Sequence, residues 1–439
     1  MLETLRNALK VKEIRKRLLY TFMMLVVVRL GSQIPLPFVN GDTVKSITSQ
    51  FSEGAFSFFA AITGGSMENM SIFALSITPY ITASIIIQLL TIAIPKLEEM
   101  QKEGEDGRKK IAAITRYVTI ALALIESIAM SVGFGRSGLI KGYQGFSTLH
   151  YIVSIIVVVA ALTAGSAMLM WLGERITENG VGNGISIVLL INIISGMPSD
   201  FATLYSTFVA PRTIAKGVLA AAIIIAILVV MVVLVCFLQD GERRIPVQYS
   251  QKVSGRKSFG GQSTNIPLKV NTAGVMPVIF ASSLMQFPVI IAQLFGKSYE
   301  WTRYLSSSYW CRVSAPKYSL GLILYIVLLI IFAYFYTSIT FNPIEVADNL
   351  KKAGGVIPGI TPGKSTSDYL NNILNYIVFV GAVGLLIVAL IPIMCTGFFN
   401  ASVSFGGTSV IIIVGVVLET LKQIESQMVN RYYKGFLSE

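Results

Sequence analysis

Long apolar runs separated by short polar segments dominate the chain. A helix that crosses a bilayer needs about 20 mostly apolar residues, and the runs supply ten candidate spans. They are residues 18–35, 73–94, 112–133, 149–172, 184–199, 217–238, 272–293, 318–340, 371–395 and 400–421. The fifth span is the weakest, because its clean apolar run covers only residues 185–197. The pattern predicts an all-α membrane protein.

Basic residues between the spans test the fifth one. With ten spans and the N-terminus inside, the inside segments carry 25 Lys and Arg residues and the outside segments nine. Without the fifth span the split becomes 19 to 15. Because basic loops stay on the cytoplasmic side, ten spans with both termini cytoplasmic are favoured. Span parity then suggests two five-helix halves of inverted topology with a pathway between them, although the halves share no clear residue-level similarity.

The spans divide the chain into four regions: a cytoplasmic N-terminal segment 1–17, an N-terminal half 18–199, a C-terminal half 200–421 and a cytoplasmic tail 422–439. In the first region, Leu2, Leu5, Leu9 and Ile14 recur at helical spacing opposite a basic face. We expect an amphipathic helix at the membrane interface; a solvated basic tail is the alternative.

Three further segments are not spans. Residues 54–72 are apolar at first and then small and polar, so they form either a re-entrant segment that fills a cavity or an external loop. Two long inside loops cover 239–270 and 341–369. The alternation from Ile245 to Tyr249 predicts a hairpin in the first loop. Both loops are candidate docking surfaces for a large partner; orientation signals are the alternative.

Composition narrows the chemistry. Of 439 residues, 54% are hydrophobic and 13% charged, and the mean hydropathy is +0.69, which excludes an ordinary soluble enzyme. Three separated cysteines and one histidine support neither a disulfide framework nor a metal site. Residues 358–365 approach a phosphate-binding loop, but Pro358 stands where that loop needs glycine. We therefore expect no cofactor, no direct nucleotide binding and no enzyme activity.

Two charged residues fall within predicted spans. Arg29 lies near the outer end of the first span, where its side chain is expected to reach up to the interface. Glu126 lies well inside the third span, where a carboxylate marks a polar pathway or pairs with a neighbouring helix. The β-branched runs of other spans are lipid-facing or packing residues, and a few could form an apolar constriction that excludes water.

Seven ordered motifs then resemble one family, the SecY family of protein-conducting channels, nearly from end to end. The motifs are SIFAL (71–75), PYITASIIIQLL (79–90), EGEDGRKK (103–110), MWLGERITENGVGNGIS (170–186), PLKVNTAGVMP (267–277), FNPIEVADNLKK (341–352) and FGGTS (405–409).

This resemblance implies ten helices in two inverted halves around an hourglass pore with a lateral gate. The family's apolar pore ring matches Ile77, Ile81, Ile185, Leu189, Ile279 and Ile412. Its plug, a short re-entrant helix, matches about 58–69, with Phe58, Phe59, Ile62, Gly64, Gly65, Met67 and Asn69. The gate would lie between spans two and three and spans seven and eight, with Gln88 and Glu126 on its polar face.

The family's basic pair for motor and ribosome docking matches Arg256 and Lys257 in the first long loop. In the second loop, Lys351, Lys352 and Lys364 are expected to add positive charge to the same docking surface. The family usually has arginine where this chain has Thr361, which shifts the expected docking toward the basic pair. The implied partners are the small subunits SecE and SecG, the SecA ATPase, the ribosome, signal sequences, preproteins and membrane lipids.

The resulting prediction is a channel in the bacterial cytoplasmic membrane. It would pass unfolded polypeptides, release hydrophobic segments sideways into the bilayer, and take its energy from an external ATPase or the ribosome. An inverted-repeat secondary transporter is the alternative, but such a protein needs polar groups near mid-membrane and Glu126 is the only acidic candidate. A membrane-embedded enzyme would need paired catalytic residues that the sequence does not provide.

Overall fold

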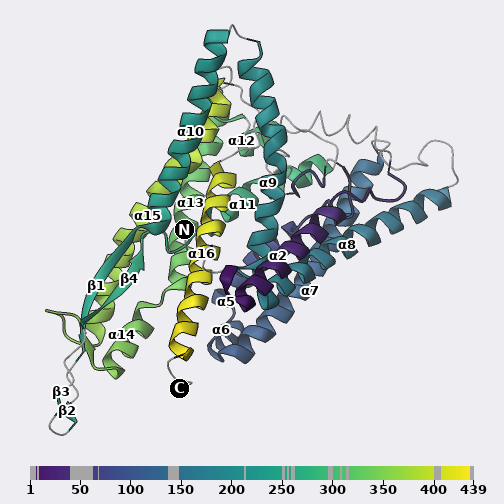
Figure 1. The fold of residues 1–439 in the computed structure, drawn as a ribbon. Coiled ribbons are helices and arrows are strands. Elements are labelled where there is room, and N and C mark those ends of the chain that lie inside the picture. Colours follow the sequence, from purple (N-terminus) through teal and green to yellow (C-terminus); the bar gives the residue numbers. More distant parts are fainter. Residues whose placement is uncertain are drawn as a thin grey trace.

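The computed structural model is almost entirely helical (Figure 1). It describes residues 6, 9–39, 63–67, 69–136, 148–211, 214–249, 253–254, 257–258, 263–294, 300–306, 309–312, 316–399 and 407–435. The main helices are α2 (Lys12–Gly31), α5 (Thr78–Ala93), α6 (Pro95–Lys102), α7 (Glu105–Arg136), α8 (Thr148–Asn179), α9 (Gly184–Leu204), α10 (Ile214–Asp240), α11 (Met276–Leu294), α13 (Leu320–Thr340), α14 (Pro343–Lys352), α15 (Lys364–Phe399) and α16 (Gly407–Gly435).

Shorter elements complete the described part. They are the π-helical turn η1 (Tyr205–Val209), the helix α12 (Glu300–Leu305), the 3₁₀ turn η3 (Pro316–Ser319), and the strands β1 (Glu242–Tyr249), β2 (Val253–Ser254), β3 (Lys257–Ser258), β4 (Ser263–Lys269) and β5 (Gly355–Val356). All of them lie between the long helices.

Each of the ten predicted spans overlaps one long helix in the described residues: α2, α5, α7, α8, α9, α10, α11, α13, α15 and α16. Among the described residues, six helical segments are long and apolar enough to cross a membrane, and a seventh is added if the bent pair α5–α6, which turns by 105°, counts as one span. The weak fifth span is among the six, because α9 and η1 together form the segment Gly184–Val209. The chain is therefore a multi-pass membrane protein.

The first span differs from its predicted bounds. Helix α2 begins at Lys12 and ends at Gly31, so it absorbs the last residues of the predicted interfacial helix 1–17. Ile14 is only 3% exposed and packs against Val181 and Ile424, so it contacts protein. The helix ends early because the extended residues that follow bond to another segment: the Leu36 amide donates to the Met70 carbonyl.

The ten long helices pack in two groups (Figure 1). In the first group α2 packs on α8 and α9, α5 on α7, α7 on α8, and α8 on α9. In the second group α10 packs on α15 and α16, α11 on α13, α13 on α15, and α15 on α16. The pairings are the same in both groups when the helices of each group are numbered from one to five in chain order. In each group the first helix packs on the fourth and fifth, the second on the third, the third on the fourth, and the fourth on the fifth. Between the groups, α9 packs on α16 and α7 on α11.

The two long loops form one unit. The predicted hairpin is confirmed, since β1 and β4 pair antiparallel with Ile245 opposite Ile266. Strand β5, from the second loop, pairs with the other edge of β1 and gives the strand order β4-β1-β5. Ile245 and Val247 point to the same face of β1 and are buried with Leu350 and Leu370. We call β1, β4, β5 and α14 the loop platform.

Candidate functional site

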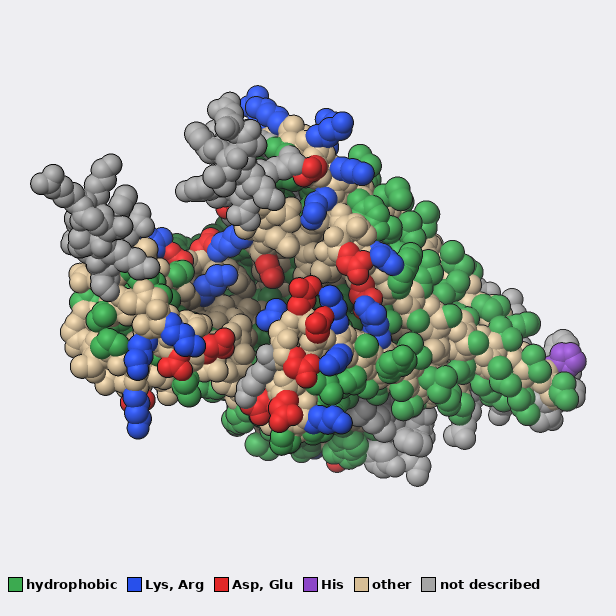
Figure 2. Space-filling view, turned by 90° about the horizontal axis from the view of Figure 1, so that it is seen from below, with side chains coloured by type: hydrophobic (Ala, Val, Ile, Leu, Met, Phe, Trp, Pro, Cys, Tyr) green, Lys and Arg blue, Asp and Glu red, His purple; other side chains and the backbone are tan. Residues whose placement is uncertain are grey.

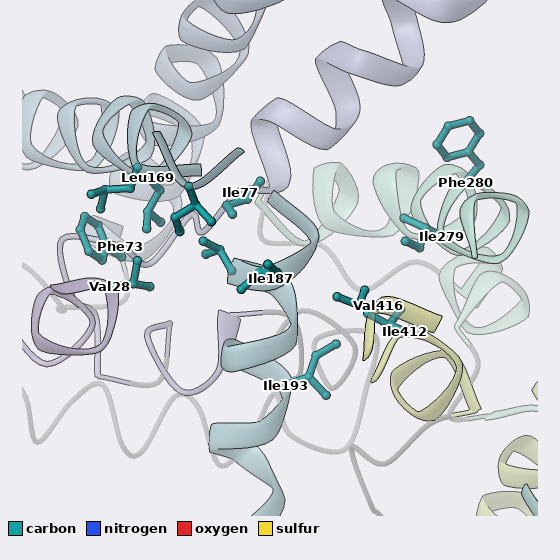
Figure 3. Packing of buried hydrophobic residues seen from close by; sticks show 13 residues of the cluster. Val28, Phe73, Ile77, Leu169, Ile187, Ile193, Ile279, Phe280, Ile412 and Val416 are labelled. Atoms are coloured by element: carbon teal, nitrogen blue, oxygen red, sulfur yellow. The ribbon is translucent and has the colours of Figure 1, made fainter. Parts of the chain in front are cut away.

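Five of the six predicted ring residues belong to or pack against one apolar cluster, and Figure 3 shows three of them, Ile77, Ile279 and Ile412. Ile77, Ile279 and Ile412 are between 1% and 5% exposed, and Ile81 and Ile185 pack against them. We call these five residues the collar. Leu189, the sixth, is also buried, at 5% exposure, but lies outside this cluster.

Local structure places each collar residue near the start of a helix. Ile77 immediately precedes α5, and Ile81 follows one turn later. Ile185 lies in the first turn of α9, where the Asn183 side chain caps the helix by accepting a hydrogen bond from the Ile185 amide at 3.1 Å. Gly182, with a φ of +80°, makes the turn between α8 and α9 that brings this cap into position. Ile279 and Ile412 lie in the first two turns of α11 and α16.

The collar offers a passing molecule no strong polar contact. Its side chains are branched hydrocarbons, and the cluster extends through other apolar residues such as Val28, Phe73 and Val416 (Figure 3). An apolar constriction of this kind excludes water and ions when it is closed. Its side chains offer a polypeptide no hydrogen-bond donor or acceptor.

The predicted plug residues are described only in part. Phe58, Phe59 and Ile62 lie outside the described residues. Gly64 and Gly65 form a turn with φ values of +60° and +81°, and the Asn69 amide donates to the Gly65 carbonyl at 3.0 Å. Met67 packs on a second apolar cluster that contains Leu36, Met70 and Leu162. The described residues 63–67 and 69 are thus compact turns packed between helices.

The predicted gate residues lie on neighbouring helices. Gln88 is on α5 and Glu126 is on α7, and both are half-buried. The Gln88 amide nitrogen donates to the Ser84 hydroxyl at 3.4 Å, and its amide oxygen is buried without a hydrogen-bond partner among the described residues. Helix α7 packs on both α5 and α11, so it joins the two groups of helices where the gate is expected.

Three of the predicted docking residues lie on or beside the loop platform. Arg256 lies outside the described residues, and Lys257 begins the strand β3. Lys351 and Lys352 end α14 and Lys364 begins α15, and all three are exposed. Figure 2 shows the end of the molecule that includes this platform: Lys, Arg, Asp and Glu side chains collect there, whereas the surface beyond is hydrophobic.

Sequence patterns missed two features. Strand β5 is only two residues long, too short to show an alternating pattern. The Arg29 guanidinium, which was expected to reach up to the interface, donates a hydrogen bond to the Gly64 carbonyl at 3.2 Å, a partner that the sequence did not indicate. No local signal links these residues, which are 35 positions apart.

Comparison with known proteins identifies the family. The SecY family model matches residues 71–421. The protein translocase subunit SecY of Streptomyces coelicolor is 44% identical over 447 residues, and the alignment covers 100% of both chains. A solved SecY structure, whose plug domain is described as stabilising the closed state of the translocation channel, is 19% identical, with a TM-score of 0.65 and coverage of 95% of this chain and 94% of that one. Sec61 in the canine ribosome–channel complex is 18% identical, with a TM-score of 0.62 and the same coverages. The chain therefore belongs to the SecY family.

Proposed function

We propose that this chain is the channel subunit of a protein translocase and that unfolded polypeptides cross the membrane through its collar. The observation that carries the proposal is the collar itself: helices from both groups bring five isoleucines into one cluster. The full-length relative named as a protein translocase subunit supports the same function. The chain provides the path, and it needs no catalytic site of its own to do so.

Ten membrane crossings in two inverted halves account best for the fold. Both groups of helices make the same pairings. The collar residues come from the second and fifth helix of each group, namely α5, α9, α11 and α16. A repeat with this arrangement puts the pathway at the interface between its halves, which is where the collar lies.

This arrangement gives the channel three working parts: a seal, a plug and a lateral gate. The collar seals around the passing chain. The segment about 58–69 closes the resting pore, in line with the plug domain described for the solved relative. Helices α5 and α7 separate from α11 and α13 to open a lateral gate near Gln88 and Glu126, so that a signal sequence of about 20 apolar residues can partition into lipid.

The charged end of the molecule sets the orientation. Figure 1 shows the β1–β4 hairpin, α6, α14 and the C-terminal end of α16 at one end, and the 25-to-9 distribution of basic residues supports a cytoplasmic location for that end. The relatives are bacterial, which supports the cytoplasmic membrane of a bacterium. Outside labelling of a cysteine at position 256 would contradict this topology.

The chain would work together with small membrane subunits, and the energy for translocation would come from other partners. We infer SecE and SecG as membrane partners, the SecA ATPase and the ribosome as sources of driving force, and signal sequences, preproteins and lipids as ligands. The canine relative was solved in a ribosome–channel complex, and the exposed basic residues of the loop platform offer charges for such a partner.

A site-specific crosslink tests the proposal. A photoreactive side chain at Ile81 or Ile279 should capture a preprotein that is stalled during translocation. The matched control is Ile323 on α13, which is 59% exposed and is not part of the cluster. Equal capture at Ile323 and Ile81, or none at either collar position, would overturn the pathway through the collar.

A further inference from the structure

The backbone at Gly64 lies directly against α9. A Cβ atom at this position would be 2.5 Å from the Asn192 carbonyl oxygen and 2.7 Å from the Ser195 hydroxyl oxygen. Gly64 also has a φ of +60°, which side chains rarely allow. Thr63 and Ser66 on either side of it are buried to 1% and 2% exposure. The segment is therefore seated tightly on one turn of α9.

Two side chains from different helices donate hydrogen bonds to the carbonyl of Gly64. The Gly64 carbonyl accepts a hydrogen bond from the guanidinium of Arg29 at 3.2 Å and from the hydroxyl of Ser195 at 3.2 Å. The Ser195 hydroxyl shares its single hydrogen with the Asn192 carbonyl at 2.8 Å, so its bond to Gly64 is the weaker one. The Arg29 bond is stronger because its donor is charged. Both lone pairs of the carbonyl oxygen are thus used.

The same turn of α9 also bonds to Ser76, which lies between this segment and α5. The Asn192 side-chain amide donates to the Ser76 hydroxyl at 3.1 Å, and both residues are buried, at 2% and 1% exposure. Ser76 directly precedes the collar residue Ile77 and has a φ of +52°. Asn192 and Ser195 lie three residues apart, so they share one face of the helix. One helical turn therefore fixes both Gly64 and the entry to α5.

We propose that Arg29, Ser195 and Asn192 are positioning residues that hold the pore-sealing segment in its closed position, with the Gly64 carbonyl as the anchor. The inference rests on the proposed role of residues 58–69 as the plug. Displacement of the segment must break the Arg29 bond, which leaves a half-buried guanidinium to find a new partner. The free energy of this bond therefore sets part of the closed-to-open ratio, while the collar sets the rest.

The strength of the anchor can be tested by measuring the resting ion conductance of the assembled translocase in planar bilayers. Arg29→Met should raise the resting leak about ten- to hundredfold, the usual effect of losing a hydrogen bond from a charged donor. Ser195→Ala should raise it only about two- to tenfold, because the hydroxyl is neutral and shared. Arg29→Lys and Ser195→Thr keep a donor and should restore most of the seal. Ser199→Ala is the matched control, since that hydroxyl donates to the nearby Gly196 carbonyl on the same helix.

The plug deletion separates the anchor from a merely structural role. Removing residues 60–68 deletes the acceptor Gly64, so Arg29→Met and Ser195→Ala should add no further leak in that background. Preproteins with intact signal sequences should still be translocated by all variants, which shows that the channel has folded.

Three outcomes would count against these ideas, and they are distinguishable. If the deletion leaks but Arg29→Met with Ser195→Ala does not, the anchor is wrong and the plug assignment stands. If both substitutions add the same leak with and without residues 60–68, their effect does not pass through Gly64 and the anchor is again wrong. If the deletion leaves the resting conductance unchanged, the proposed plug is wrong and the anchor falls with it.

Discussion

The collar and the loop platform are built in opposite ways. The collar brings together isoleucines that are up to 335 positions apart in sequence, from Ile77 to Ile412, and exposes no charge. The loop platform takes its strands and α14 from two loops, buries a small apolar core under them, and leaves Lys351, Lys352 and Lys364 exposed. The collar presents only hydrocarbon side chains, whereas the loop platform presents charged side chains on its surface and buries an apolar core beneath them.

Under the proposed function, this difference separates sealing of the pore from docking of a partner, two tasks that place opposite demands on a surface. A site that grips a partner needs fixed charges and hydrogen bonds, and such groups would hold back a polypeptide in transit. A seal needs a surface that water leaves readily. Substitutions should therefore affect either conductance or docking, and the following predictions ask whether the two effects can be separated.

The largest effect is expected in the core of the platform. Leu370 has no exposed surface and packs with Ile245 and Val247. Leu370→Ala should destabilise this unit by about 2–5 kcal/mol, because it leaves a cavity in a packed core. Hydrogen exchange of the β1 amides should rise and partner binding should fall, while resting conductance stays unchanged. Ile344→Ala, at a position 65% exposed on α14, is the control; equal effects of the two changes would contradict the assigned core.

A polar side chain in the collar should affect only the seal. Ile412 is 2% exposed, and a buried amide without a partner costs about 1–3 kcal/mol. Ile412→Asn should raise the resting ion conductance roughly tenfold, since the amide holds water in the closed constriction. Ile412→Val keeps the hydrocarbon surface and should leak little. A loss of SecA or ribosome binding in Ile412→Asn would break the proposed separation.

Charge reversal of the basic pair should affect only docking. Arg256→Glu combined with Lys257→Glu should lower SecA or ribosome affinity roughly tenfold, and the loss should grow as the salt concentration falls, because charges are screened over about 8 Å at physiological salt. Arg212→Glu combined with Lys216→Glu, both on the predicted outer side, makes the same change in charge and should have no effect. The assignment fails if affinity survives the reversal while substitutions at 359–363 abolish it.

The smallest effect is expected at Thr361. Its carbonyl accepts a hydrogen bond from the Thr366 hydroxyl at 2.9 Å, and its own side chain is exposed. Thr361→Arg should therefore keep the local turn and tighten partner binding by no more than about fivefold, the range of an exposed ion pair. Thr361→Gln adds length without charge and serves as the control. Weaker binding by Thr361→Arg would contradict the view that this position lacks only a cation.

Much of the architecture could be predicted from the sequence because membrane-spanning segments carry their signal locally. The apolar runs anticipated helices at all ten places, including the weak fifth at α9, and the alternation at Ile245–Tyr249 anticipated a strand. The types of residue in the collar came from ordered motifs that resemble a family. Their meeting in one cluster is a structural finding, and their role as a pore ring remains a proposal.

The tertiary structure alone decided which distant groups meet. The sequence placed Arg29 at a membrane edge, yet burial beside Gly64 gives its guanidinium a carbonyl partner. The two long loops looked separate, yet β5 of the second loop pairs with Gln248 and Tyr249 at the end of β1. Sequence patterns predict whether a segment lies in lipid or in water, because that preference depends on residues close together in the chain. Which backbone group satisfies which side chain depends on packing between segments far apart in the chain, and only the folded arrangement fixes it.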